Sequence, residues 1–166
     1  MKKLKLMTAL LLLFVGGNVM AQELEIPEDI KLETAADYEA TEALVLESIA
    51  WLQDNPLASN PSKRKELNRF LIKWISGSPS VTIELLSGLA PIDCPECLIS
   101  FMGGWTKYSL ENDYSKNKIE GALAGAESSI AFYEKNKAEL GKNSDIEKMI
   151  QQQKKGKLRK YVEGKF

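Results

Sequence analysis

The chain has 166 residues, of which 44% are hydrophobic, 27% are charged and 8% are aromatic. This composition is typical of a globular protein of one domain, and it excludes fibrous and disordered chains. The sequence contains no histidine, which excludes a Ser-His-Asp or Cys-His catalytic centre and a histidine-ligated metal site. These exclusions remove large classes of enzyme but do not identify an activity.

The first 21 residues have the pattern of an export signal. Lysines at positions 2, 3 and 5 precede an apolar run from Leu6 to Val15, and Val19-Met20-Ala21 fits the preference of a signal peptidase. The apolar stretch is shorter than the roughly 20 residues that a spanning helix needs. We therefore expect cleavage after Ala21, a periplasmic or secreted location, and no integral membrane segment after cleavage.

An extended acidic arm is predicted over residues 22–33, which combine Pro27 with many acids and show no helical periodicity. Apolar residues then recur at helical spacing from about residue 35 until Asn55-Pro56 ends the run. The next helix is predicted to begin at Pro61, with Asn60 as its N-cap, and to end at Gly77-Ser78-Pro79.

Residues 80–92 mix strand-favouring and helix-favouring side chains, so a short helix and an irregular segment both stay open. A helix beginning at Pro95, capped by Asp93 or Cys94, is predicted to continue through Tyr108. Gly103-Gly104 lies in its middle, where each glycine costs about 1 kcal/mol in an exposed helix. We therefore expect either a kink or the close approach of another backbone at this point.

Ser115 is the predicted N-cap of a longer helix that ends at Gly141. Small residues recur along it at a spacing of four, at Gly121, Gly125 and Ser129. They predict a close crossing with another helix, for which the Gly103-Gly104 segment is the expected partner. A further helix capped by Ser144 is predicted to end before Gly156, and a last docked turn to follow from Leu158.

The sequence therefore predicts an all-α fold, a single domain of about five helices packed as helix hairpins. Its organisation is a signal peptide over 1–21, the acidic arm over 22–33 and a helical domain over 34–166. The helix starts are irregularly spaced, which argues against a repeat. Trp51, Trp74 and Trp105 fall on the apolar faces and are expected in the core.

Charge is unevenly distributed along the chain. Residues 22–54 contain ten acids against Lys31 alone, whereas residues 148–166 contain seven bases against Glu163 alone. These stretches are either solvated helix faces attracted to one another, or the basic tail contacts an anionic surface such as lipid headgroups or polysaccharide. Nucleic acid is not expected as a partner, because the exported chain is net acidic and its basic segment lacks interleaved aromatics.

Cys94-Pro95-Glu96-Cys97 is the one motif with evident chemistry. Its two thiolates would supply half of a structural zinc site, and haem attachment would need histidine where Leu98 stands. A redox interpretation places the Cys94 thiol at the positive end of a helix, which lowers a thiol pKa. The structural interpretation is a local Cys94–Cys97 disulfide formed in an oxidising compartment.

Four stretches resemble small exported proteins of Bacteroidetes-type bacteria for which no activity is established. They are Asn60–Lys65, Trp74–Pro79, Cys94–Leu98 and Phe101–Tyr108. The resemblance implies a periplasmic or secreted helical domain and brings no cofactor or catalytic residue with it.

We expect an exported, non-enzymatic helical module that binds a protein, a peptide or a cell-envelope component in a groove between helices. The alternative is a periplasmic thiol-disulfide redox protein, in which Cys94 attacks and Cys97 resolves the mixed disulfide. A carboxylate-based hydrolase is a third hypothesis, but the sequence does not select a pair from its 23 acids. No cofactor, metal ligand or further catalytic residue is predicted, and the binding residues and oligomeric state stay open.

Overall fold

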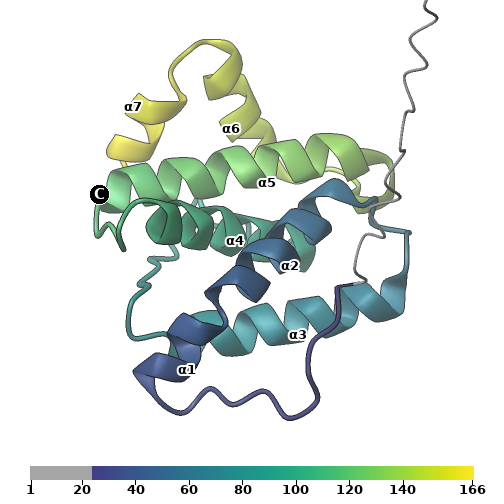
Figure 1. Cartoon of the computed structure of the whole chain (residues 1–166). Helices are drawn as coiled ribbons and strands as arrows, with labels where there is room; N and C mark the ends of the chain where they lie inside the picture. The colour runs from purple at the N-terminus through teal and green to yellow at the C-terminus, as the bar shows by residue number, and fades with distance from the viewer. Residues whose placement is uncertain (1–23) are drawn as a thin grey trace, which may run out of the picture.

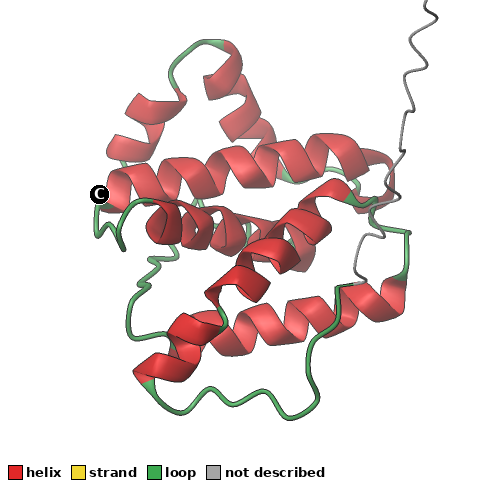
Figure 2. Ribbon diagram, viewed as in Figure 1, coloured by secondary structure: helices red, strands yellow, loops and turns green. Residues whose placement is uncertain are grey.

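The computed structural model describes residues 24–166, and the expected signal peptide lies outside this range. Within it the chain is all-helical and forms one body of seven helices without a strand (Figures 1 and 2). The helices are α1 (Ala35–Ala40), α2 (Glu42–Asp54), α3 (Pro61–Gly77), α4 (Pro95–Glu111), α5 (Lys118–Leu140), α6 (Ser144–Lys154) and α7 (Leu158–Glu163). The all-α fold predicted from the sequence is confirmed, with more helices than expected.

One extra helix arises at Thr41, which divides the first predicted helix into α1 and α2. The Thr41 hydroxyl donates to the carbonyl of Asp37 at 2.9 Å and accepts the indole N–H of Trp74 at 2.9 Å. Such side-chain bonds compete with the regular backbone ladder. The apolar stripe continues across the break, so periodicity alone did not reveal it.

The helix starts follow the predicted caps with two corrections. Asn60 caps α3 from the left-handed region (φ 41°), and Cys94 caps α4, with proline at the first helical position in both cases. The predictions of Ser115 and Ser144 as caps were wrong, because Asn117 caps α5 and Asn143 caps α6. Asparagine and serine are comparable N-caps, so the sequence did not distinguish neighbours of these two types.

The core consists of two hydrophobic clusters. The N-terminal cluster gathers α1, α2 and α3 around the fully buried Trp74, and the C-terminal cluster gathers α5, α6 and α7 around Tyr133 and Met149. Helix α4 joins them, because Phe101 lies in the C-terminal cluster while Met102 packs on the N-terminal one. Trp74 and Trp105 are buried as predicted, whereas Trp51 is only half-buried.

Helices α4 and α5 cross closely at their glycines, as predicted. A Cβ added at Gly104 would lie 2.6 Å from the carbonyl oxygen of Ala124, and one at Gly125 would lie 2.8 Å from that of Phe101. The glycines therefore allow backbone to approach backbone. This crossing fixes α4, and with it the Cys94 motif, against α5.

The two non-helical segments pack on the clusters. Residues 24–34 form no helix, and Leu24, Ile26, Ile30 and Leu32 lie against the N-terminal cluster. Residues 80–92 are irregular with a turn, which decides between the two predicted alternatives, and Leu89 and Ala90 are buried in the C-terminal cluster.

The acidic and basic stretches lie toward opposite ends of the molecule, with α1 at one end and α6 and α7 at the other (Figure 1). Arg159 forms a two-bond ion pair with Glu120 of α5, each contact 2.7 Å long. No ion pair within residues 24–166 joins the acidic stretch to the basic one. None of the helices described over this range is long and apolar enough to cross a membrane.

Candidate functional site

Helix α3 presents a stripe of bases on its outer surface. Lys65, Arg69 and Lys73 recur at every fourth residue, so they lie along one side of the helix, and all three are exposed. Within the described chain, no carboxylate lies at ion-pairing distance from any of them. We call these three residues the basic stripe. It concentrates positive potential along a helix whose other side is buried in the N-terminal cluster.

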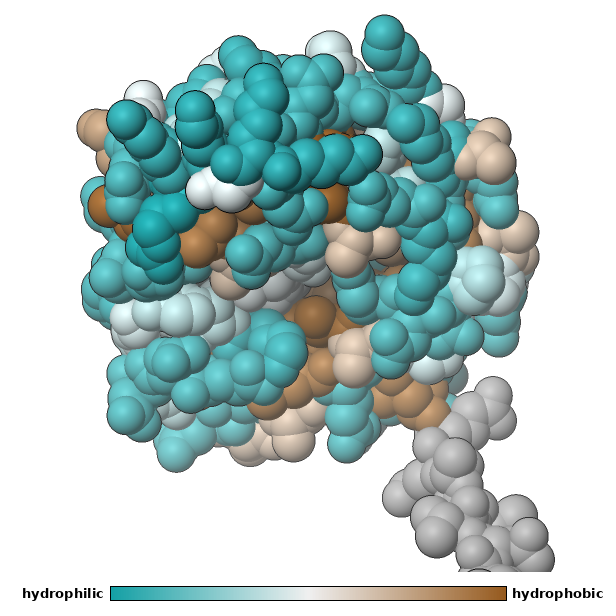
Figure 3. Space-filling model, turned by 90° about the horizontal axis from the view of Figure 1, so that it is seen from above, coloured by the Kyte–Doolittle hydropathy of each residue, from teal (hydrophilic) through white to brown (hydrophobic). Residues whose placement is uncertain are grey.

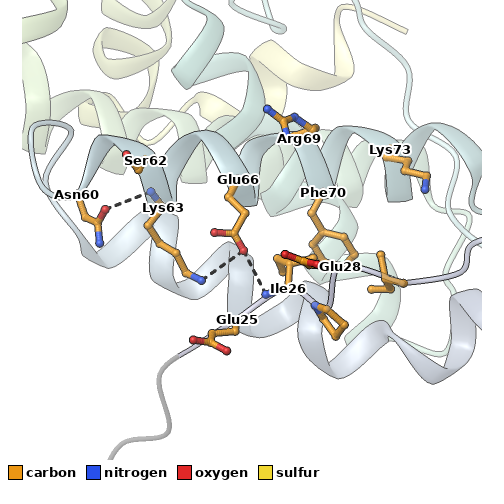
Figure 4. Close-up of a pocket in the computed structure, with 12 residues that line it drawn as sticks. Glu25, Ile26, Glu28, Asn60, Ser62, Lys63, Glu66, Arg69, Phe70 and Lys73 are labelled. Atoms are coloured by element: carbon orange, nitrogen blue, oxygen red, sulfur yellow. Dashed lines mark hydrogen bonds and ion pairs between the residues drawn. The ribbon is translucent and has the colours of Figure 1, made fainter.

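A first groove of about 780 Å³ lies between α3 and residues 25–30 (Figure 4). Figure 4 shows Glu66 pointing from α3 toward this segment, where its carboxylate accepts the backbone N–H of Ile26 at 3.2 Å. Lys63 lies 3.5 Å from the same carboxylate. The segment itself is acidic, with Glu25 and Glu28 beside the apolar Ile26 and Ile30. Helix α3 thus already holds one acidic, apolar stretch of chain.

A second groove of about 630 Å³ flanks α3 and reaches the start of α4. Its apolar lining comes from Leu57, Pro61 and Ile72, and Ile72 is 46% exposed. Its polar lining comes from the basic stripe together with Arg64, Asn68 and Glu96. Both grooves include Arg69 and Lys73, so the same bases border the two grooves.

Arg64 forms part of the floor of the second groove and is 4% exposed. Its guanidinium lies 5.7 Å from the ring centre of Trp51 and 5.5 Å from that of Phe132. It donates to carbonyls at the C-terminal end of α2, with contacts of 2.8 Å to Asn55 and 3.4 Å to Leu52. This is the negative end of the α2 dipole, which favours a cation.

Burial lowers the pKa of the Arg64 guanidinium, and the nearby Glu96 carboxylate opposes that effect. The two groups are 3.7 Å apart. Asn68 donates to both oxygens of the same carboxylate, at 3.0 and 3.2 Å. Glu96 is therefore held by α3 side chains, and it connects the groove to the cysteine motif.

Cys94 and Cys97 lie at the start of α4, next to this network. Their sulfurs are at disulfide distance, and their Cα atoms are 5.2 Å apart. The Cys97 N–H lies 3.3 Å from the Cys94 sulfur, and Ser129 of α5 donates to the Cys97 carbonyl at 3.1 Å. Cys94 is 7% exposed and Cys97 is fully buried. Both cysteines are therefore buried, Cys97 completely, which restricts the access of an incoming thiol.

The arrangement is suited to non-covalent recognition. It offers cations along a helix, apolar side chains beside them, and a rigid floor held by buried hydrogen bonds. The sequence singled out the cysteines, but it missed Arg64 and Asn68. The sequence did contain a signal that these two polar residues are buried. Arg64 falls on the same i, i+3, i+7 stripe as Leu67 and Leu71, and Asn68 follows one turn after Arg64.

Comparisons of the chain with protein-family models, curated proteins and solved structures found no match. The resemblance to small exported proteins of Bacteroidetes-type bacteria therefore stays a prediction. The chain's own residues are the basis for assigning it a function.

Proposed function

We propose that this protein is an exported, non-enzymatic helical module that binds an acidic segment of a protein or peptide in the second groove. The observation that carries the proposal is the basic stripe, whose three cations have no carboxylate partner within the described chain and border an open groove with apolar lining. An extended acidic segment with interspersed apolar side chains would satisfy both features.

The first groove shows how apolar side chains of an extended segment of this chain pack beside α3. Residues 24–34 place Ile26 and Ile30 on the N-terminal cluster, while Glu25 and Glu28 line the groove and Lys63 pairs with Glu66 of its own helix. A partner on the other side of α3 would meet the same helix and two of the same bases. The expected partner is therefore chemically similar to the chain's own N-terminal segment.

The position of binding can be tested by cross-linking. A photoreactive phenylalanine analogue replaces Ile72, which lines the second groove, or Tyr114, which is 39% exposed in the turn between α4 and α5. We expect the Ile72 derivative, expressed in its native host, to give a discrete adduct with a partner that contains an acidic segment. The matched Tyr114 derivative should not form this adduct.

Adducts of equal yield from both positions, or none from Ile72, would overturn the proposal. Mass spectrometry of the adduct identifies the partner segment. A partner peptide without acidic residues would also contradict it, because the basic stripe is the feature on which the assignment rests.

A thiol-disulfide function is the second candidate. The helix-capping position of Cys94 and the N–H of Cys97 directed at its sulfur both favour a thiolate there. A reduction potential well above about −300 mV, with loss of function in Cys94→Ser, would support redox catalysis over the binding module. If Cys94→Ser lowers only the melting temperature, the redox function is excluded.

A further inference from the structure

The end of the molecule opposite α3 carries a second basic surface. It consists of the lysines of α6 and α7 and of the residues that follow each helix, namely Lys148, Lys154, Lys155, Lys157, Lys160 and Lys165. None of the six has a carboxylate at ion-pairing distance within residues 24–166. Arg159, by contrast, is paired with Glu120. The exposed Glu163 is the one acid within residues 148–166, and Asp145 and Glu147 lie in the first turn of α6.

Tyr161 organises this surface. The ammonium groups of Lys148 and Lys165 lie 5.4 and 5.1 Å from the centre of its ring. Its hydroxyl donates to the Gly88 carbonyl at 2.9 Å, and Lys165 donates to the Ser87 carbonyl at 3.0 Å. These bonds fix the irregular segment 80–92 against α7, so that both contribute to one surface.

Two large apolar side chains are exposed in the segments that these bonds join. Phe166 is 48% exposed and follows Lys165 directly, and Leu85 is 51% exposed two residues before Ser87. Leu158 and Val162 are buried, so α7 turns its apolar side inward and Lys160 outward. Figure 3, which views the molecule from this end, shows hydrophilic side chains with hydrophobic areas between them.

We propose that this surface, which we call the lysine face, binds the headgroup region of an anionic phospholipid bilayer. Exposed lysines near anionic lipid each contribute about 1 kcal/mol of attraction, or about fivefold in partitioning. The exposed ring of Phe166 can enter the headgroup boundary while lysine amines stay at the phosphates, and Tyr161 holds Lys148 and Lys165 beside its own ring. The proposal is independent of the second groove. That groove is lined by α3, which lies at the other end of the molecule from α6 and α7 (Figure 1).

The exposed apolar side chains favour lipid over an anionic polysaccharide as the ligand. A polysaccharide would engage the lysines through charge alone and gain nothing from Phe166 or Leu85. A bilayer would bury part of both side chains, and burial of apolar surface is favourable in proportion to its area. The two ligands therefore predict different results for a change at Phe166.

Co-sedimentation of the segment Gln22–Phe166 with vesicles tests the proposal. We expect binding to vesicles of phosphatidylcholine with about 40% phosphatidylglycerol, and little to phosphatidylcholine alone, because the attraction is electrostatic. The variant Lys157→Gln/Lys160→Gln should lower partitioning by about 25-fold, from two lysines at about fivefold each. Phe166→Ser should lower it by about three- to tenfold, since it removes part of one buried aromatic group.

The matched control is Lys65→Gln/Lys73→Gln, which removes two charges from the basic stripe on α3. It should change vesicle binding by less than about twofold, because those lysines would face away from the bilayer. An equal loss of vesicle binding in both double variants, or equal binding of the protein to both vesicle types, would overturn the proposal that the lysine face binds a bilayer. If Phe166→Ser binds vesicles as well as the unaltered protein, and the protein is retained on dextran sulfate, the lysine face binds an anionic polymer instead. Unchanged circular dichroism establishes that each variant is folded.

Discussion

Arg64 shows how one buried side chain can support both the fold and the groove. Its guanidinium donates to carbonyls at the C-terminal end of α2, lies over the rings of Trp51 and Phe132 and contacts Glu96. Buried charges are tolerated only with such a set of partners. The residue thus joins α2, α3 and α4 at the floor of the second groove.

We expect Arg64→Met to lower the free energy of unfolding by about 2–4 kcal/mol, because it leaves buried carbonyls without donors. Arg69→Met is the matched control on the same helix and should cost less than about 0.5 kcal/mol, since Arg69 is exposed. Urea unfolding of both variants measures the difference. Similar losses in the two would show that Arg64 does not have this structural role.

Glu147 makes the stability of the fold depend on pH. The Lys137 ammonium and the Tyr133 hydroxyl bond to its carboxylate and lower its pKa from that of an ordinary glutamate. A carboxyl with a lowered folded-state pKa stabilises the fold above its unfolded pKa, and this contribution is lost as the pH falls through the folded pKa.

The melting temperature of Glu147→Gln should therefore lie below that of the unaltered protein at pH 7. The gap should narrow as the pH falls below about 4, where the unaltered carboxyl also becomes neutral. Thermal unfolding followed from pH 7 to pH 2 measures it. A gap that stays constant over this range would contradict the assignment.

At the scale of elements, the α4–α5 crossing depends on which glycine faces the partner helix. A Cβ at Gly104 would meet the Ala124 carbonyl oxygen at 2.6 Å, whereas one at Gly103 would meet the Ile49 side chain at an ordinary 3.4 Å. Both glycines lie in α4, so alanine gains the same helix propensity at each.

Gly104→Ala should accordingly destabilise the protein by about 1–3 kcal/mol through overpacking. Gly103→Ala should be neutral or stabilising by up to about 1 kcal/mol. Chemical denaturation of the two variants checks the pair. Equal effects would indicate that the helices do not cross at the depth described.

We expect the Cys94–Cys97 disulfide to stabilise only the start of α4. A loop this short removes little chain entropy, on the order of 2 kcal/mol before any strain. Native protein should show no reactive thiol before reduction and two after reduction in denaturant. Reduction should lower the melting temperature while the helical circular dichroism is retained. Two reactive thiols in unreduced native protein would contradict the disulfide.

Sequence reasoning located most helix ends, because Asn60-Pro61, Gly77 and Gly141 are strong local signals. It missed the break at Thr41, which depends on a bond from Trp74, 33 residues away. It singled out the cysteine motif but not the groove. The groove needs Leu57, α3 and the start of α4 to meet, and no local pattern encodes that meeting.

At the scale of the molecule, two hydrophobic clusters share α4 and separate two basic surfaces. The basic stripe lies on α3, which packs on the N-terminal cluster, and the lysine face lies on α6 and α7, which pack on the C-terminal one. A protein of this form could lie on a bilayer with one end and present its groove at the other. The acidic stretch and the basic tail of the sequence lie toward opposite ends of the fold.

The charge dependence of partner binding at α3 tests the central claim most directly. The affinity of the partner captured through Ile72 is to be measured for the unaltered protein, for Arg69→Glu, and for the control Lys142→Glu, which alters an exposed lysine away from both grooves. We predict that Arg69→Glu weakens binding by at least about tenfold, that added salt does the same, and that Lys142→Glu changes it by less than about twofold. Equal affinity of all three proteins, unaffected by salt, would contradict recognition of an acidic segment by the basic stripe.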